Sequence, residues 1–200
     1  MPNHQQLLFR SGGYRNLKSF RLSRVCYNVT VRFVELYIPA NSRTTDQMVQ
    51  AARSGVQNIA EGSVASATSK RTELKLTNVA RASLEELRLD FEDYLLQHSA
   101  AIWSKDEPYA REFIRRRVDS NRAFREFVEW AMLQPSPMSV SVRNCPMKSV
   151  IVANAALLLI RTTCYFLDHQ IARLAADFEK SGGFSERMYR HRLKNRGDIL

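Results

Sequence analysis

The chain has 200 residues, a length that suits one domain large enough to bury a hydrophobic core. Hydrophobic residues make up 44% of it, which excludes a chain that is disordered throughout, and only 7 Gly and 6 Pro favour long helices over a β fold with many turns. Thirty Lys and Arg against 20 Asp and Glu give a net charge of +10, which suits a polyanionic partner and equally a solvated basic surface.

The first part of the chain is predicted to be a polar leader over residues 1–12, followed by a helix over residues 14–38. Two apolar stripes run along this helix, as expected where a helix touches more than one neighbour. Its first half carries cations at three-residue steps, which keeps them broadly on one side: Arg15, Lys18, Arg21 and Arg24. This basic ridge is either a solvated face or a contact surface for nucleic acid or an acidic partner. Pro39 is expected to end the helix.

Residues 46–97 are predicted to form a helical hairpin, the core of the domain, with its turn over Gly62–Ser69. Loop and N-cap chemistry for its first helix comes from Asn41, Ser42, Thr44, Thr45 and Asp46, and Ser69 is a candidate N-cap for its second helix. The second helix has an apolar stripe at Leu76, Ala80, Leu84, Leu87, Phe91 and Leu95. Its polar residues are expected to lie on the outer side of the helix: Lys75, Arg81, Glu85, Arg88 and Glu92. Asn58 and Glu61 lie one turn apart and are expected to point toward Ser83. They form either a buried polar pairing that sets the helix register or the mouth of a ligand pocket.

The same hairpin carries a resemblance to a known family. The run Asn58-Ile59-Ala60-Glu61-Gly62, then a basic turn, then Ala80-Arg81-Ala82-Ser83-Leu84-Glu85-Glu86-Leu87, resembles the bacterial four-helix-bundle family. That family includes the proteins encoded in intervening sequences of 23S ribosomal RNA genes and the accessory variability protein of diversity-generating retroelements. The longer chain, with Gly13–Leu17 ahead and Gly182–Phe184 behind, is similar to its "four helix bundle suffix" members. One departure is Ala82, where many members have Gly.

The resemblance implies a fold and an assembly habit more than a reaction. Family members form bundles that associate into a five-membered barrel, and the retroelement member binds a reverse transcriptase and nucleic acid. We therefore expect a homopentamer with RNA or DNA and a reverse transcriptase as partners. The residues that carry the motif are expected to be structural: Asn58, Glu61, Gly62, Ser83 and Glu85.

After the hairpin, residues 98–108 form a break in which Trp103 is expected to anchor onto the core. Residues 109–133 are predicted to be one helix in which phenylalanines alternate with arginines such as Arg115; these aromatics either anchor in the core or stack on bases. A connector over residues 134–147 leads to a long last helix over residues 148–179. Its apolar run Val150–Ile160 is too short for a membrane span, so we expect a core helix and no membrane partner.

The C-terminal residues 181–200 are predicted to be a basic tail that either grips phosphates or solubilises the chain. Its cations include Arg187, Arg190, Arg192 and Lys194. The three cysteines, Cys26, Cys145 and Cys164, are widely spaced without a CxxC pair. They favour buried thiols in a reducing compartment, and the start of the chain lacks a signal-peptide pattern, so we expect a cytoplasmic protein.

Patterns of catalytic chemistry are scarce. No glycine-rich phosphate loop follows a strand, and no His or Cys spacing suggests a metal, so we expect no catalytic residue, no metal and no cofactor. The sequence predicts an all-α protein, a mostly antiparallel four-helix bundle with an additional C-terminal helical region.

The predicted function is that of a non-enzymatic, oligomeric, nucleic-acid-binding adaptor, an accessory subunit of a reverse transcriptase or retroelement ribonucleoprotein. Phosphate contacts are assigned to cations along the chain: Arg15, Lys18, Arg21, Arg24, Lys70, Arg71, Lys75, Arg115, Arg187, Arg190, Arg192 and Lys194. Two alternatives stay open. One is a protein–protein scaffold whose basic surface meets an acidic partner without nucleic acid, and the other is an enzyme of unrecognised type.

Overall fold

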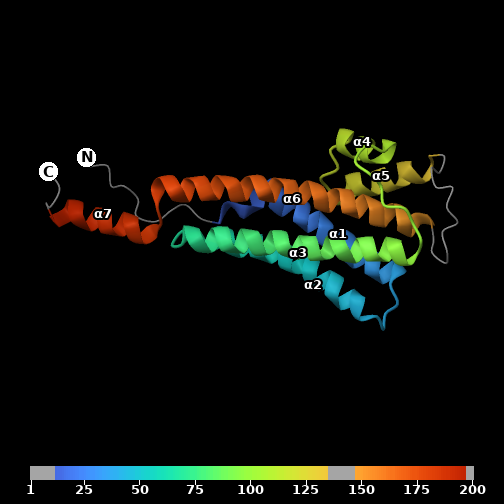
Figure 1. Ribbon diagram of the computed structural model, residues 1–200, viewed down its shortest axis with the longest axis horizontal. Coiled ribbons are helices and arrows are strands. Elements are labelled where there is room, and N and C mark those ends of the chain that lie inside the picture. Colours follow the sequence, from blue (N-terminus) through green and yellow to red (C-terminus); the bar gives the residue numbers. More distant parts are fainter. Residues whose placement is uncertain (1–11, 135–146, 197–200) are drawn as a thin grey trace.

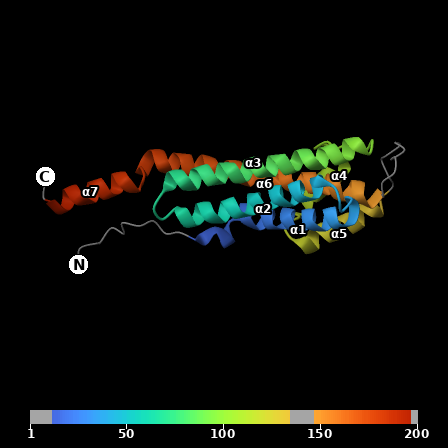
Figure 2. The same cartoon turned by 90° about the horizontal axis from the view of Figure 1, so that it is seen from below.

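The computed structural model describes residues 12–134 and 147–196, and all regular structure in these two ranges is helical. The predicted all-α class is therefore confirmed. Four long helices lie side by side (Figures 1 and 2): α1 (Lys18–Tyr37), α2 (Arg43–Ala65), α3 (Lys70–Gln97) and α6 (Met147–Ser181). The shorter elements are η1 (Gly13–Asn16), α4 (Pro108–Arg115), α5 (Asn121–Met132) and α7 (Phe184–Arg196).

The long helices pack in a ring. Helix α2 packs along both α1 and α3, and α6 packs along the same two helices from the other side. Helices α4 and α5 pack against α6, with α5 also touching α1, while η1 packs on α1 and α2. Because α1 and α3 are both neighbours of α2 and α6, their outward faces point away from each other.

The core is built from the apolar stripes that the sequence predicts. On α3, the residues from Ala80 to Leu95 in the predicted stripe are fully buried, and only Leu76 stays partly exposed. Phe33 of α1 meets Phe91 and Tyr94 of α3, with ring centroids 4.9 and 4.8 Å apart. Burying one large apolar side chain is worth about 1.5–3 kcal/mol, so these stripes explain why the four helices associate.

The predicted turn at Gly62 is wrong, because α2 continues to Ala65. Gly62 instead allows close packing: a Cβ there would lie 3.2 Å from the backbone oxygen of Glu73 on α3. Gly55, two turns earlier on α2, faces α3 even more closely, since its Cβ would lie 2.9 Å from side-chain carbons of Leu84. The turn begins after Ala65, and Ser69 caps α3 by accepting a hydrogen bond from the Thr72 amide at 3.1 Å.

The single helix predicted over residues 109–133 is also wrong. Helix α4 ends at Arg115, Arg117 adopts a left-handed φ of 51°, and Ser120 starts α5 by accepting a hydrogen bond from the Ala123 amide at 3.2 Å. The break lets both short helices bury aromatic rings, and Phe113 and Phe127 pack edge to face at 5.0 Å. Of the two alternatives for these phenylalanines, the structure therefore supports core anchoring.

The long last helix and the anchor before it match their predictions. Trp103 is buried and stacks on Tyr109 with ring centroids 4.6 Å apart, while its backbone amide donates to the Asn154 side chain of α6 at 2.8 Å. Helix α6 ends where Gly182 adopts a φ of 68°. By length and composition α6 could cross a membrane, but 72% of its most apolar window is buried in the protein, as in a core helix. The residues expected to form the leader and the connector lie almost wholly outside the described ranges.

Candidate nucleic-acid interface

The basic ridge predicted at the start of the chain lies on η1 and the first turns of α1. Leu22, Val25 and Cys26 turn one side of α1 into the core, so residues between them in the helical repeat face outward. Arg21 and Arg24 of α1 are exposed, as is the η1 arginine, Arg15. None of the three forms an ion pair with a described residue. We call Arg15, Lys18, Arg21 and Arg24 the α1 basic face.

Lys18 differs from its three neighbours on this face. Its ammonium nitrogen lies 4.0 Å from the carboxylate of Asp119 and 5.3 Å from the ring centroid of Phe166 on α6. The side chain is therefore drawn sideways toward α6 and the start of α5. Part of its charge is already balanced. The three arginines are therefore better placed than Lys18 to donate hydrogen bonds to phosphate groups.

The cations at the start of α3 form a second surface. Lys70 is partly buried and donates to the carboxylate of Glu73 at 2.8 Å, whereas Arg71 and Lys75 are exposed. Since α3 lies across the ring from α1, the structure does not join this group to the α1 basic face. Both helices nevertheless start toward the end of the molecule from which α7 projects (Figure 1).

Arg115 stands apart from both groups. Helix α4 packs on α6, and the Arg115 guanidinium donates two hydrogen bonds of 2.6 Å to the Glu112 carboxylate. These bonds, with one from Arg116, lower the pKa of Glu112 to about 2. The charge of Arg115 is therefore balanced locally. On α7, Arg190 and Arg192 are exposed, and the side chains of Arg187 and Lys194 lie outside the described part of the chain.

The motif residues of the hairpin divide into two groups. The Asn58 amide donates to the backbone oxygen of Ser54 at 2.9 Å and to its hydroxyl at 3.0 Å, and that hydroxyl lies 2.9 Å from the hydroxyl of Ser83. Asn58 is thus linked to Ser83 through Ser54, and the chain of bonds joins α2 to α3. Glu61, which was expected to join it, is exposed on the outside of α2. The network fits a register contact between two helices.

Glu85 belongs to the seam between α3 and α6. It pairs with Arg88 at 2.7 Å and with Arg81 at 3.9 Å, and Arg81 also pairs with Asp168 of α6. The polar residues Arg81, Glu85 and Arg88 were predicted to lie on the outer side of α3. They flank the packed face instead, because α6 approaches α3 on that side.

The outer side of α3 holds a feature that the sequence reasoning missed. Ala82, Leu89 and Leu96 follow one another at seven-residue steps and are exposed, Leu89 by 50% and Leu96 by 62%. Exposed carboxylates at Glu86 and Asp93 lie between them in sequence. We call these five residues the α3 outer stripe. Its signal was readable as apolar residues on the helix side opposite the core.

The remaining titratable chemistry is buried or dispersed. Cys26 and Cys164 are free thiols, as predicted, and burial raises the pKa of Cys26 to about 12 and that of Cys164 to about 11. Cys145 lies outside the described residues. Within the two described ranges, no three His, Cys, Asp or Glu side chains gather as a metal site would require. Comparison with protein families, with curated proteins and with solved structures finds no match to this chain.

Proposed function

We propose that the protein is a non-enzymatic, oligomeric adaptor that holds RNA or DNA on the α1 basic face. The observation that carries the proposal is the exposure of Arg15, Arg21 and Arg24 together, without a carboxylate partner among the described residues. In this proposal the four long helices form a mostly antiparallel four-helix bundle. The ring of contacts and the short α2–α3 turn support that arrangement.

The spacing of the arginines suits a phosphate backbone. Arg21 and Arg24 are three residues apart, which is about 4.5 Å along a helix axis, so their guanidinium groups can reach neighbouring phosphates. Contacts of this kind position a nucleic acid without reading its bases. Binding should therefore be weakly sequence-specific and should fall steeply with salt.

We further propose that the adaptor is a homo-oligomer in which the α3 outer stripe of one copy is covered by another. Exposed leucines on this stripe support the idea, because their burial would favour association. The family resemblance suggests five copies, a place in a retroelement ribonucleoprotein of the cytoplasm, and docking of a reverse transcriptase.

Binding of a labelled single-stranded RNA tests the main proposal, measured across a salt series with duplex DNA in parallel. The double variant Arg21→Ala/Arg24→Ala should bind about tenfold or more weakly at low salt, and the slope of log affinity against log salt should fall by about 1.4 for the single strand. The control is Arg115→Ala/Arg122→Ala, which loses the same charge from arginines bonded to Glu112 and Glu126. An equal loss of RNA affinity in both double variants would show that binding depends on the net charge of the protein and not on the α1 basic face.

The alternative is a scaffold that meets an acidic protein. Pull-down from lysate treated with nuclease separates the two functions. A partner that depends on Arg21 and Arg24 and survives nuclease treatment, together with wild-type protein that ignores RNA and DNA at low salt, would favour the scaffold.

A further inference from the structure

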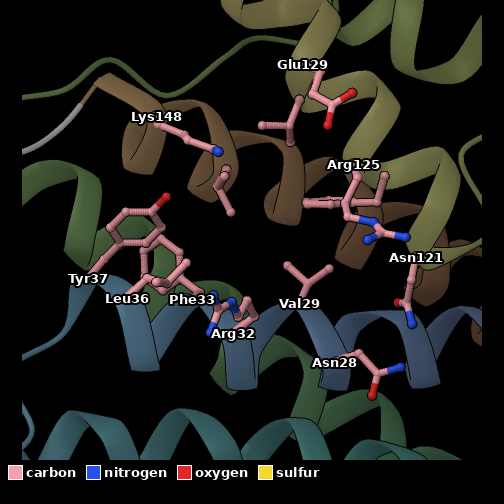
Figure 3. Close-up of a pocket in the computed structure, with 13 residues that line it drawn as sticks. Asn28, Val29, Arg32, Phe33, Leu36, Tyr37, Asn121, Arg125, Glu129 and Lys148 are labelled. Carbon is pink, nitrogen blue, oxygen red and sulfur yellow. The ribbon is translucent and has the colours of Figure 1, made fainter.

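A groove of about 550 Å³ opens between α1, α5 and the first turns of α6 (Figure 3). Its floor is apolar: Val29 and Phe33 come from α1, and Phe124 and Val128 come from α5. All four side chains are almost wholly buried, so they belong to the core of the protein. Leu36, which is half exposed, and Val152 extend the apolar lining to the walls. We call this hollow the α1–α5 groove.

The rim of the groove is predominantly positive. Arg32, Arg125 and Lys148 line it from three different helices, against the single carboxylate of Glu129. Arg32 is paired with Glu35, which lies outside the lining, at 3.1 Å. Neither Arg125 nor Lys148 forms an ion pair with a described residue. In Figure 3 the Lys148 ammonium reaches toward the hollow from α6, and Arg125 lies across it on α5.

Hydrogen-bonding groups complete the lining. The side-chain amides of Asn28 and Asn121 stand at one end and Tyr37 at the other (Figure 3). Tyr37 is partly buried, and this burial raises the pKa of its hydroxyl, opposed by the charge of Arg32. The groove thus combines an apolar floor, a few polar groups and an excess of positive charge, in a volume typical of small-ligand sites.

We propose that the α1–α5 groove binds a small organic anion, with its apolar body on the floor and its anionic group between Arg125 and Lys148. An inorganic anion would leave the apolar floor unused, and a neutral hydrocarbon would leave the two cations without a partner. The ligand must therefore carry both parts. The site is separate from the α1 basic face, since it uses none of Arg15, Lys18, Arg21 or Arg24, and it stands whether or not the protein binds nucleic acid.

Two fluorescent dyes with the same aromatic body test the proposal on the full chain: anilinonaphthalene sulfonate, which is anionic, and phenylnaphthylamine, which is its neutral counterpart. The sulfonate should bind saturably at one molecule per chain. Arg125→Ala and Lys148→Ala should each weaken it about fivefold or more, because each removes a charge-assisted contact in a partly dry site. Affinity for the neutral dye should stay unchanged in both variants.

The matched control is Arg122→Ala, one turn earlier on α5. Arg122 is exposed, bonded to Glu126 at 2.7 Å and outside the groove lining, so its loss should leave sulfonate binding unaltered. Glu129→Gln should instead tighten sulfonate binding, since it removes the one carboxylate of the lining. Val152→Trp should fill the hollow and abolish binding of both dyes, with helical circular dichroism as the check on folding.

Three results would overturn the proposal. One is the absence of saturable sulfonate binding by the wild-type chain. Another is an equal response of the Arg125, Lys148 and Arg122 variants, which would reduce the effect to net charge. The third is loss of sulfonate binding in Leu89→Glu/Leu96→Glu, which would show that the dye binds at the α3 outer stripe and not in the α1–α5 groove.

Discussion

Helices α1 and α3 both pack one side into the core, but the residues that they expose differ: α1 exposes arginines, and α3 exposes leucines and carboxylates. Each helix turns apolar residues into the shared core and leaves one side exposed to the solvent. On α1 that side carries Arg21 and Arg24, whereas on α3 it carries Leu89 and Leu96 together with the carboxylates of Glu86 and Asp93. Burial of apolar residues therefore stabilises the fold in both cases, and the outward residues alone decide what each helix can contact.

The difference suits two kinds of partner. Exposed arginines attract phosphates from a distance through their charge. Half-exposed leucines gain by being covered, which requires a close-fitting protein surface. Because α2 and α6 separate the two helices, one molecule could engage a polyanion on α1 and another protein copy on α3 at the same time.

The largest effect is expected from breaking the α3 face. In Leu89→Glu/Leu96→Glu, two charges replace side chains that the proposed assembly buries, and covering the exposed half of each leucine is worth about 1 kcal/mol. The oligomer should dissociate to the 23.0 kDa chain, as measured by light scattering after size exclusion. RNA affinity per chain at the α1 basic face should change much less.

The control for this experiment is Ile114→Glu on α4. Ile114 is 64% exposed, close to the value for Leu96, but it belongs to α4, which packs against α6 and not on the outer side of α3. Its variant should keep the wild-type mass. A wild-type chain that is already monomeric at micromolar concentration would refute the assembly outright.

A smaller effect, on stability, is expected from Gly55→Ala. This variant perturbs the packing of α3 on α2 and leaves the exposed residues of α1 unchanged. The new methyl would lie 2.9 Å from Leu84, so α3 must move or Leu84 must leave its position. Overpacking of this kind costs about 1–3 kcal/mol, partly offset by the better helix propensity of alanine. Urea unfolding should show the loss, and RNA binding by α1 should persist.

Gly13→Ala provides the reference, because a Cβ at Gly13 meets nothing within 4 Å. It should leave the urea midpoint nearly unchanged. A Gly55→Ala variant as stable as the wild type would mean that the close approach of α2 and α3 is not a constraint.

The smallest effect concerns the carboxylates of α3. Burial, reinforced by the charges of Asp93 and Glu86, raises the pKa of Asp90 above its ordinary value of 3.8. The folded state therefore holds this proton more tightly than the unfolded state, and ionised Asp90 lowers stability at neutral pH. The penalty should fade as pH falls through the raised pKa and vanish below 3.8.

Asp90→Asn should raise the melting temperature at pH 7 by no more than about 2 °C, because the group is partly solvated. The gain should disappear at acid pH, as followed by circular dichroism. Asp93→Asn, at an exposed position, serves as the comparison and should give a smaller change. An equal gain from both variants would assign the effect to general repulsion along α3.

Local chemistry made much of the fold predictable. Ser69 was expected as an N-cap, and Ser42 was one of five residues expected to supply loop and N-cap chemistry; each accepts the capping bond from an amide of the helix that follows. The stripe of α3 was predicted from its spacing because an α-helix repeats every 3.6 residues. One error arose because a glycine can either begin a turn or allow two helices to pack closely. Gly62 was predicted to begin the turn, but in the structure it allows α2 to pack closely on α3.

The sites divide in the same way. Exposure of Arg21 and Arg24 was readable from their spacing along one helix, but the pairing of Lys18 with Asp119 was not, because the partner lies 101 positions later in the chain. The local bond from Arg115 to Glu112 lies within one helix and was within reach of sequence reasoning. A prediction that an arginine or lysine on a helix is available to bind phosphate must therefore consider carboxylates one helical turn away.

By itself, the sequence determined that the chain is helical, which residues of each helix enter a core, and that the chain carries excess positive charge. Periodicity and composition suffice for these, because they depend on residues close together in the chain. Only the tertiary structure decided which outward residues come together. The α1–α5 groove draws Arg32, Arg125 and Lys148 from three helices, and their proximity follows from how those helices pack.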